Sequence, residues 1–474
     1  MTIRARGTDA MAESAVTTGE RAGAGAGRDL ARSLTAPGLV AIGLGATIGA
    51  GIFVLTGTAA AQYAGPALSL SFVIGGIACG LVGLCYAELA AMIPEPGSTY
   101  TYTRASLGRF PAWIIGWDLV LEFAVAAATV AVGWSGYAQS LAAEFGLHLP
   151  RALAGAPGDG GLVNLPAAGI VLLLSALLMR ATEEASLVNG LLVACKVAII
   201  LAFVGVGVAH LRPDLWHPFV PENAGTFGAY GWSGVFRGAA VVFFAFVGFE
   251  TVATAAGECR APQRDAPVGL IGSLLITTIL YVAVAAVLTG LVPYRDLDVA
   301  DPVAKAVDVI GLPGFSTIIK AGALIGLTTS ALTALYGQSR IFFAIARDGL
   351  LPGIFCRVHP VTRVPVASQL VIGLFTAAVA GLVPIDVLGE IVSIGTLLAF
   401  CLVCATVLIL RRTDPDRARP FRVPAVTLTA GFGILSCLAL MASLPADTWI
   451  RLAVWLAIGL AIYAGYGRRH GRLS

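Results

Sequence analysis

Long apolar segments separated by short polar turns fill the chain after residue 33. A helix needs roughly 20 apolar residues to cross the hydrocarbon core of a bilayer, and most of these segments have that length. The pattern predicts twelve membrane-spanning helices, at 36–61, 66–93, 111–142, 163–180, 185–209, 235–257, 268–292, 314–343, 366–382, 387–410, 424–443 and 449–466. The predicted fold class is therefore an all-α polytopic membrane protein.

The first apolar segment has the motif GATIGAGIF at positions 45–53, in its middle. Glycine is a poor helix former, so this motif predicts a helix that is interrupted near the bilayer centre. Lipid cannot satisfy the backbone groups exposed by a break, which must therefore face protein, water or a ligand. A half-helix that starts there points N–H groups at a cavity, which suits a carboxylate. The alternative is a helix-packing face formed by Gly38, Gly45 and Gly49.

The sixth segment contains a second glycine-bearing motif, FFAFVGFE at positions 243–250. Its place in the chain mirrors the first break. Inverted-repeat transporters have this pattern, with the substrate near the midplane between the two broken helices. We therefore expect two halves of five spans, a five-plus-five inverted repeat with helices 1 and 6 broken, followed by two further spans. This arrangement favours the broken-helix interpretation over simple packing.

The composition agrees with a membrane protein. The 474 residues are 57% hydrophobic and 12% charged, whereas soluble domains have about 25% charged residues. Lys and Arg in short loops stay on the cytoplasmic side of a membrane protein. If the N-terminus is cytoplasmic, most of the 30 Lys and Arg residues fall on that side of the predicted spans. We expect a cytoplasmic-membrane protein with both termini inside: a disordered tail at 1–33, a twelve-helix domain at 34–467 and a short tail at 468–474.

Other functional classes have little support. Cys401 and Cys404 form a C-x-x-C inside a predicted span, without a second pair or a nearby His, so they predict packing rather than a metal site. No Ser/His/Asp, H-x-x-x-H or P-loop arrangement indicates an enzyme. A channel is disfavoured because the two breaks are asymmetric and no charged rings occur. We expect no cofactor, no metal and no nucleic-acid partner.

Lys196 lies in the middle of the fifth predicted span. A central Lys costs about 2.5 to 3.5 kcal/mol on insertion scales and usually has a function. It is a candidate proton switch, with a permanently charged structural tie as the alternative. Glu122, on the third span, is a candidate counter-charge or proton acceptor for Lys196, or a partner for a basic substrate side chain. Glu250 follows the second break and either attracts a cationic side chain or caps the helix.

Three further acids lie near span ends. Asp118 and Glu88 are close to the inner ends of their spans, which predicts gate or helix-tie roles. Glu390, near the outer start of the tenth span, is expected to face water. Asp301 and Pro302 predict a short outer helix, because Asp is a favoured N-cap and Pro a favoured first helical residue.

Several ordered motifs resemble the bacterial cationic amino acid transporters of the amino acid–polyamine–organocation (APC) superfamily. They are GLGATIGAGIFVLTG at 43–57, YAELAAMIPEPGSTYT at 86–101, GWDLVLE at 116–122, FFAFVGFET at 243–251 and YGQSRIFFAIARDGLLP at 336–352. The resemblance covers nearly the whole chain after residue 33. It implies the APC fold, with amino acid uptake that is coupled to protons or run as exchange.

The resemblance also implies roles for individual residues. The first break would hold the substrate α-carboxylate and part of its α-ammonium, through Thr47, Ile48, Gly49, Ala50 and Gly51. Carbonyl groups of the second break would complete the ammonium site, near Phe244, Ala245 and Val247. On the eighth span, Leu327 and Thr328 would shape the side-chain pocket, although a helical Thr often bonds only its own backbone. Lys196 would replace a structural sodium ion and brace the first span against the eighth.

The expected function is secondary active transport of L-amino acids, proton-coupled and sodium-independent, with cationic amino acids favoured. The alternatives are a symporter for small neutral amino acids such as Ala and Ser, an amino acid exchanger, and a sensor that does not transport. The expected partners are the L-amino acid, the proton and the lipid bilayer. The sequence gives no indication of an accessory subunit.

Overall fold

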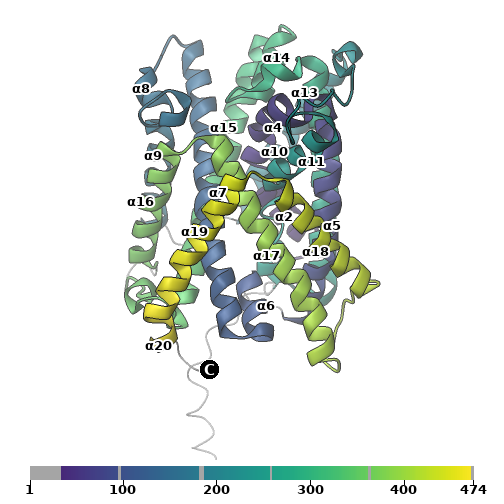
Figure 1. Cartoon of the computed structure of the whole chain (residues 1–474). Coiled ribbons are helices and arrows are strands. Elements are labelled where there is room, and N and C mark those ends of the chain that lie inside the picture. The colour runs from purple at the N-terminus through teal and green to yellow at the C-terminus, as the bar shows by residue number, and fades with distance from the viewer. Residues whose placement is uncertain (1–33, 94–97, 181–185, 257–258, 361–363, 471–474) are drawn as a thin grey trace, which may run out of the picture.

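A computed structural model describes residues 34–93, 98–180, 186–256, 259–360 and 364–470 (Figure 1). These residues form an all-helical bundle, and their only β-type contact is an isolated bridge between Leu34 and Cys259. The tail expected at 1–33 lies outside the described residues, as do 471–474 of the second tail. Residues Arg468–His470 of that second tail form the short helix α20.

The first predicted span is divided into several pieces. Its helices are α2 (Ala36–Thr47), α3 (Ala50–Phe53) and α4 (Leu55–Ala59). A π-helical turn η1 (Ala60–Ala64) and a 3-10 turn η2 (Gly65–Ala67) lead into the second span. The rest of the first half consists of α5 (Leu68–Met92), α6 (Ser98–Leu107), α7 (Arg109–Glu144), α8 (Arg151–Ala154), η3 (Pro157–Asp159), α9 (Leu165–Arg180) and α10 (Ser186–Val208).

The second half repeats this order. After η4 (Pro213–Trp216), the broken sixth span comprises α11 (Gly231–Val242), η5 (Phe243–Phe246) and α12 (Thr251–Ala255). It is followed by α13 (Pro262–Leu291), η7 (Tyr294–Leu297), α14 (Pro302–Val309), α15 (Pro313–Arg347), η8 (Gly353–Cys356), α16 (Val366–Leu382) and α17 (Ile385–Thr413). The chain ends with α18 (Val426–Ser443), α19 (Ala446–Ile462), η9 (Tyr463–Gly467) and α20. The short helix expected after Asp301 is present as α14, and its outer position stays a prediction.

Every predicted apolar segment contains a helix of the described chain. Among the described residues, nine helical stretches are long and apolar enough to cross a membrane, and three shorter apolar helices, α2, α9 and α16, accompany them. The count of twelve crossings stays a prediction. In that count, α2, α3 and α4 together make up the first crossing. Figure 1 shows α6 and α20 at one end of the bundle and α8 and α14 at the other. The two ends correspond to the predicted inner and outer sides.

Equivalent helices of the two halves pack against each other. The most extensive helix contacts are those of α5 with α13 and of α7 with α15, which are the second and third spans of each half. The fourth spans, α9 and α16, are also closely packed. Such pairing is expected when two five-helix halves are related by an axis in the membrane plane. The five-plus-five arrangement therefore appears directly in the packing, with both broken helices inside the bundle.

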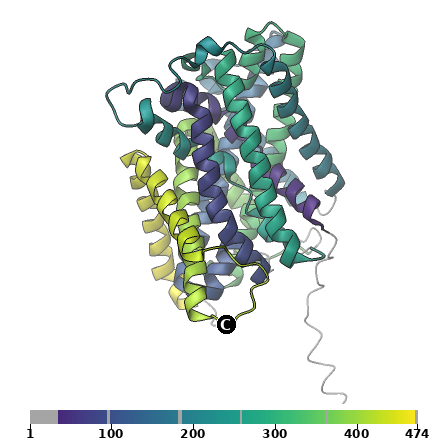
Figure 2. The same ribbon diagram turned by 90° about the vertical axis from the view of Figure 1, so that its right-hand side faces the viewer.

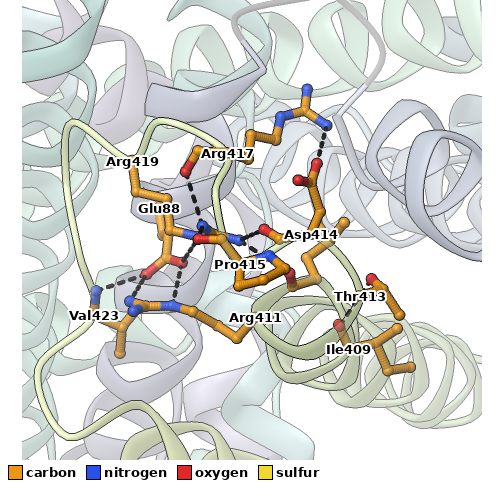
Figure 3. Close-up of polar contacts among 10 residues, drawn as sticks. Glu88, Ile409, Arg411, Thr413, Asp414, Pro415, Arg417, Arg419 and Val423 are labelled. Atoms are coloured by element: carbon orange, nitrogen blue, oxygen red, sulfur yellow. Dashed lines mark hydrogen bonds and ion pairs between the residues drawn. The ribbon is translucent and has the colours of Figure 1, made fainter.

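Glu88 ties the end of α5 to the end of α17 and to the segment that follows it (Figure 3). Its carboxylate accepts two hydrogen bonds from Arg411, at 2.9 and 2.6 Å, and one from the backbone N–H of Val423 at 2.7 Å. The Nε of Arg419 lies 3.4 Å from the same carboxylate, and its other nitrogens bond to backbone carbonyls that include those of Leu410 and Asp414. The helix-tie role expected for Glu88 is confirmed.

Replacing Glu88 with glutamine should strongly destabilise the protein. The change leaves the Arg411 and buried Arg419 guanidinium groups without their carboxylate, and breaking a buried ion pair costs about 3 to 5 kcal/mol. The measurement is the thermal unfolding midpoint of the detergent-purified variant. The matched control is Asp414→Asn, which removes an exposed pair with Arg417 and should cost about 1 kcal/mol or less. Equal midpoints for the two variants would contradict the assignment.

The expectation that Glu390 faces water is wrong. Only 10% of its side chain is exposed, and its carboxylate lies 3.4 Å from Arg237 Nη2 and 3.7 Å from Arg451 Nη1. It also accepts a hydrogen bond of 2.7 Å from Thr448 Oγ1. A position near a span end suggested exposure, but α19 covers this part of α17 in the folded protein.

Candidate substrate-binding site

The first break interrupts the helix between Thr47 and Ala50. The Ile48 N–H still bonds to the Leu44 carbonyl at 3.0 Å, but the backbone of Ile48 turns extended, with ψ of 99°. Gly49 is extended as well, at φ −153° and ψ −146°, before α3 begins. A new helix start leaves its first N–H groups without a preceding turn, and the old helix end leaves carbonyl groups free. The predicted mid-span break is therefore present at the predicted residues.

The second break lies between Val242 and Thr251. The helix tightens into the 3-10 turn η5, Val247 is extended, and Gly248 has a φ of +112°. A Cβ at Gly248 would lie 2.8 Å from the Ala46 carbonyl oxygen, so both the backbone conformation and the close approach require glycine here. The Glu250 carboxylate accepts a 2.9 Å hydrogen bond from the Gly248 N–H. Glu250 thus caps the break from its far side.

A cavity of about 50 Å³ lies between the two breaks, with room for about three to five water-sized groups. The residues that line it come from α2, α3, η5 and the second break, α7 and α15. They are Ala46, Thr47, Gly49, Ala50, Gly51, Glu122, Phe123, Ala126, Val130, Phe244, Val247, Gly248, Glu250, Thr251, Ser330, Thr333 and Ala334. Most of the wall is apolar, and two carboxyl groups stand in it.

Many of the residues expected at the site reach this cavity. They are Thr47, Gly49, Ala50, Gly51, Glu122, Phe244, Val247 and Glu250. The packing alternative holds for Gly45, where a Cβ would lie 2.4 Å from Val193 Cγ2. Gly51, which was not part of that alternative, is also tightly packed, since a Cβ there would lie 2.3 Å from the Cα of Ala245. The first motif therefore does two things: it opens a cavity at Gly49 and lets the two breaks touch at Gly51.

Four expected residues do not line the cavity. The Ile48 carbonyl is taken by Lys196 and Ser330, and the Ala245 carbonyl accepts from Tyr281 Oη at 3.0 Å. Leu327 is fully buried away from the cavity, and Thr328 Oγ1 bonds the Leu324 carbonyl of its own helix at 2.8 Å. Ile48 and Ala245 are therefore clasped by neighbouring helices, and the backbone-bonding alternative for Thr328 is confirmed.

Lys196 braces the first break against α15. Its Nζ donates to the carbonyls of Gly45 and Ile48, at 3.0 and 3.1 Å, and to Ser330 Oγ at 2.9 Å. All three acceptors are neutral oxygens, and only 2% of the residue is exposed. In the described part of the chain, no ion pair joins Lys196 to Glu122. The brace is present as expected, whereas direct pairing with Glu122 is not.

In the part of the chain that the structure describes, no ion pair is formed by the acids near the cavity. Glu122 is 2% exposed and Glu250 is 4% exposed. Within the described residues, Oε2 of Glu122 and Oε1 of Glu250 have no hydrogen-bond partner. Asp118, one turn before Glu122 on α7, is likewise buried, and neither of its carboxylate oxygens has a hydrogen-bond partner among the described residues. No contact therefore supports the helix-tie role that was expected for Asp118. The cavity is thus an acidic pocket with apolar walls.

Helical spacing could have identified several lining residues that the sequence reasoning missed. Ala126 and Val130 follow Glu122 at intervals of four, so they share its face of α7. Thr333 and Ala334 follow Ser330 at three and four residues on α15. Tyr281 had no such signal: its hydroxyl lies 2.8 Å from the Thr47 carbonyl and 3.0 Å from the Ala245 carbonyl, and so joins both breaks.

Comparison with known proteins agrees with this architecture. The family model described as amino acid permease matches residues 34–462. The methylthioribose transporter of Bacillus subtilis is 45% identical over 449 residues, which cover 94% of this chain and 96% of that protein. The branched-chain amino acid permease BcaP of the same organism is 44% identical over 465 residues, or 97% of each chain.

A eukaryotic relative is also similar. The vacuolar cationic amino acid transporter 2 of Arabidopsis thaliana is 42% identical over 394 residues, which cover 82% of this chain and 61% of that protein. All three relatives carry the names of transporters or permeases, in agreement with a membrane transporter rather than an enzyme. The family match extends over nearly the whole described bundle, including both breaks and the cavity between them. This chain therefore belongs to the amino acid permease family of the APC superfamily.

Proposed function

We propose that this permease is a secondary active transporter of L-amino acids that favours cationic substrates. The observation that carries the proposal is the pair of buried acids, Glu122 and Glu250, whose free oxygens stand at a cavity between two broken helices. A buried charge needs a partner of opposite sign, and a basic substrate side chain would supply it. The relative named as a cationic amino acid transporter is consistent with this preference.

We assign the backbone of the substrate to the two breaks. The α-carboxylate would take the N–H groups at the start of α3, around Gly49, Ala50 and Gly51, where the helix dipole is positive. The α-ammonium would take carbonyl oxygens of the second break, around Phe244 and Val247. Since the carbonyls of Thr47, Ile48 and Ala245 already accept hydrogen bonds from neighbouring helices, we assign them to holding the breaks in place.

Proton coupling is assigned to Lys196 and Glu122. A protonated Lys has three N–H donors, and Lys196 uses them on three oxygens of two different helices. Loss of one proton removes both the charge and a donor, which would loosen α2 from α15. An ammonium on this oxygen cluster also takes the place that a sodium ion would need, which supports sodium-independent transport. Glu122 would take part in proton transfer across the cavity, without direct contact to Lys196.

A second candidate is a transporter for neutral amino acids. Its support is the apolar part of the cavity wall, formed by Phe123, Ala126, Val130, Phe244 and Val247. The relative named as a branched-chain amino acid permease is consistent with it. In this case Glu122 would serve proton coupling alone. We place the protein in the cytoplasmic membrane with both termini inside.

A thermal-shift screen of the purified protein distinguishes the two candidates. L-Arg, L-Lys and L-ornithine should raise the unfolding temperature at millimolar concentrations without sodium, because a ligand at 100 times its Kd adds about 2.7 kcal/mol of stability. Glu250→Gln should weaken the response to these ligands by at least fivefold in Kd. The exposed Asp447→Asn is the matched control and should leave it unchanged. Selective stabilisation by Ala, Ser, Leu or Val would instead support the neutral candidate.

A further inference from the structure

A buried charge cluster lies where both broken helices meet the last two helices. It consists of Arg237 on α11, Glu390 on α17, and Thr448 with Arg451 on α19. Arg237 and Glu390 have only 12% and 10% of their side chains exposed. None of its residues is among those that line the cavity or among the partners of Lys196.

Arg237 connects the cluster to the two broken helices. Its guanidinium lies 5.4 Å from the ring centroid of Tyr63 in η1, a cation–π contact, and donates to the Ser443 carbonyl at the end of α18 at 2.6 Å. Arg237 belongs to the half-helix α11, which runs directly into η5 and places Phe244 in the cavity wall. Arg237 therefore links η1 to the half-helix that leads into the cavity wall.

η1 and α11 are in direct contact on this side of the cavity. A Cβ at Gly234 would lie 2.2 Å from the Tyr63 carbonyl oxygen, and the same oxygen accepts a 3.0 Å hydrogen bond from the Tyr230 N–H. Gln62 is held as well, by a 3.0 Å bond to Asp298. A substrate that enters from this end would need these two segments to separate. The two segments are therefore in direct contact in this structure.

Glu390 links α11, which packs against η1, to α19. One carboxylate oxygen faces Arg237, and the other accepts from Thr448 Oγ1 and faces Arg451. Thr448 is fully buried, so α19 is fixed to the carboxylate at this point. Figures 1 and 2 show the last two helices, coloured yellow, together on one flank of the bundle. They follow the two five-helix halves, yet they hold the acid that neutralises Arg237.

We propose that Glu390 is a positioning residue for transport, which holds α11 closed against η1 and makes α19 part of this outer lock. Opening requires the Arg237 link to break, while Thr448 and Arg451 keep Glu390 in place for closure. This proposal rests on the proposed transport function. The word "outer" follows the orientation proposed above, with both termini inside. Under this proposal, α18 and α19 take part in the transport cycle although they lie outside the five-plus-five repeat.

The test measures access to the cavity from the outside. A reporter cysteine is introduced as Thr333→Cys in the cavity wall, and a membrane-impermeant maleimide is added to intact cells. Glu390→Gln should raise the labelling rate at least threefold, because α11 loses its charged anchor. Thr448→Val, which keeps all the charges, should raise it in the same direction but less. Asp447→Asn, an exposed neighbour on α19, is the control and should not change it. The protein without the reporter gives the background from native cysteines.

The outcomes separate the lock from a simple structural role. Unchanged labelling in Glu390→Gln, together with a lower unfolding temperature, would overturn the proposal and make the cluster a packing feature. If Glu390→Gln does not fold, unchanged labelling in Thr448→Val overturns it as well. Protection of the reporter by L-Arg or L-Leu tests the proposed function separately. Faster labelling without protection by any amino acid would keep the lock and reject the binding site.

Discussion

Lys196→Ala is expected to abolish pH-driven accumulation of amino acids, with a loss of at least tenfold in proteoliposomes that have an inward proton gradient. The substitution removes the three hydrogen bonds that join the first break to α15, through Gly45, Ile48 and Ser330. Each hydrogen bond to a charged group contributes about 1.5 to 3 kcal/mol, so thermal stability should fall too. Any transport that remains should be downhill movement or exchange, because the group that senses the proton is gone.

Two further variants separate the switch from the brace. Glu122→Gln keeps the size of the side chain and leaves the Lys196 contacts in place, so it should lose accumulation with little change in stability. Lys305→Ala removes a half-buried Lys at the predicted outer end, where its Nζ donates to the Asp296 carbonyl, and serves as the control. Accumulation at the normal level in both Lys196→Ala and Glu122→Gln would refute the coupling mechanism, even if substrate binding is confirmed.

Gly51→Ala is expected to abolish transport and to lower the unfolding temperature sharply. The added Cβ would lie 2.3 Å from the Cα and 2.8 Å from the N of Ala245, both backbone atoms of η5 that cannot rotate away. Overpacking of a tight core costs about 1 to 3 kcal/mol and occasionally more. Here the strain also pushes the two breaks apart and changes the cavity between them. Transport assays and thermal unfolding of the purified variant measure the two effects.

Gly80→Ala provides the matched control, because nothing lies within 4 Å of a Cβ at this position of α5. Alanine is the better helix former by about 1 kcal/mol, so the control should be neutral or slightly stabilising. Normal transport by Gly51→Ala would mean that the breaks do not need to touch. A defect of the same size in both variants would show only that the bundle tolerates no added methyl group.

The sequence by itself determined the helices and the positions of the breaks. A bilayer admits only helices or closed barrels, so apolar length alone located a helix in every predicted segment. The breaks followed from glycine at 45–51 and at Gly248, because loss of helix propensity is a local property. Lys196 could be singled out for a similar reason, since a charge at mid-span is costly wherever its partners lie.

Only the tertiary structure decided which freed groups remain available. The breaks release the carbonyls of Thr47, Ile48 and Ala245, but Tyr281 is 234 residues from Thr47 in the chain and Ser330 is 282 residues from Ile48. Glu390 likewise became buried through α19, not through its own helix. A local pattern determines which backbone and side-chain groups need a partner. The packing of helices distant in sequence determines which partner each one finds, and therefore which groups are left to face the cavity.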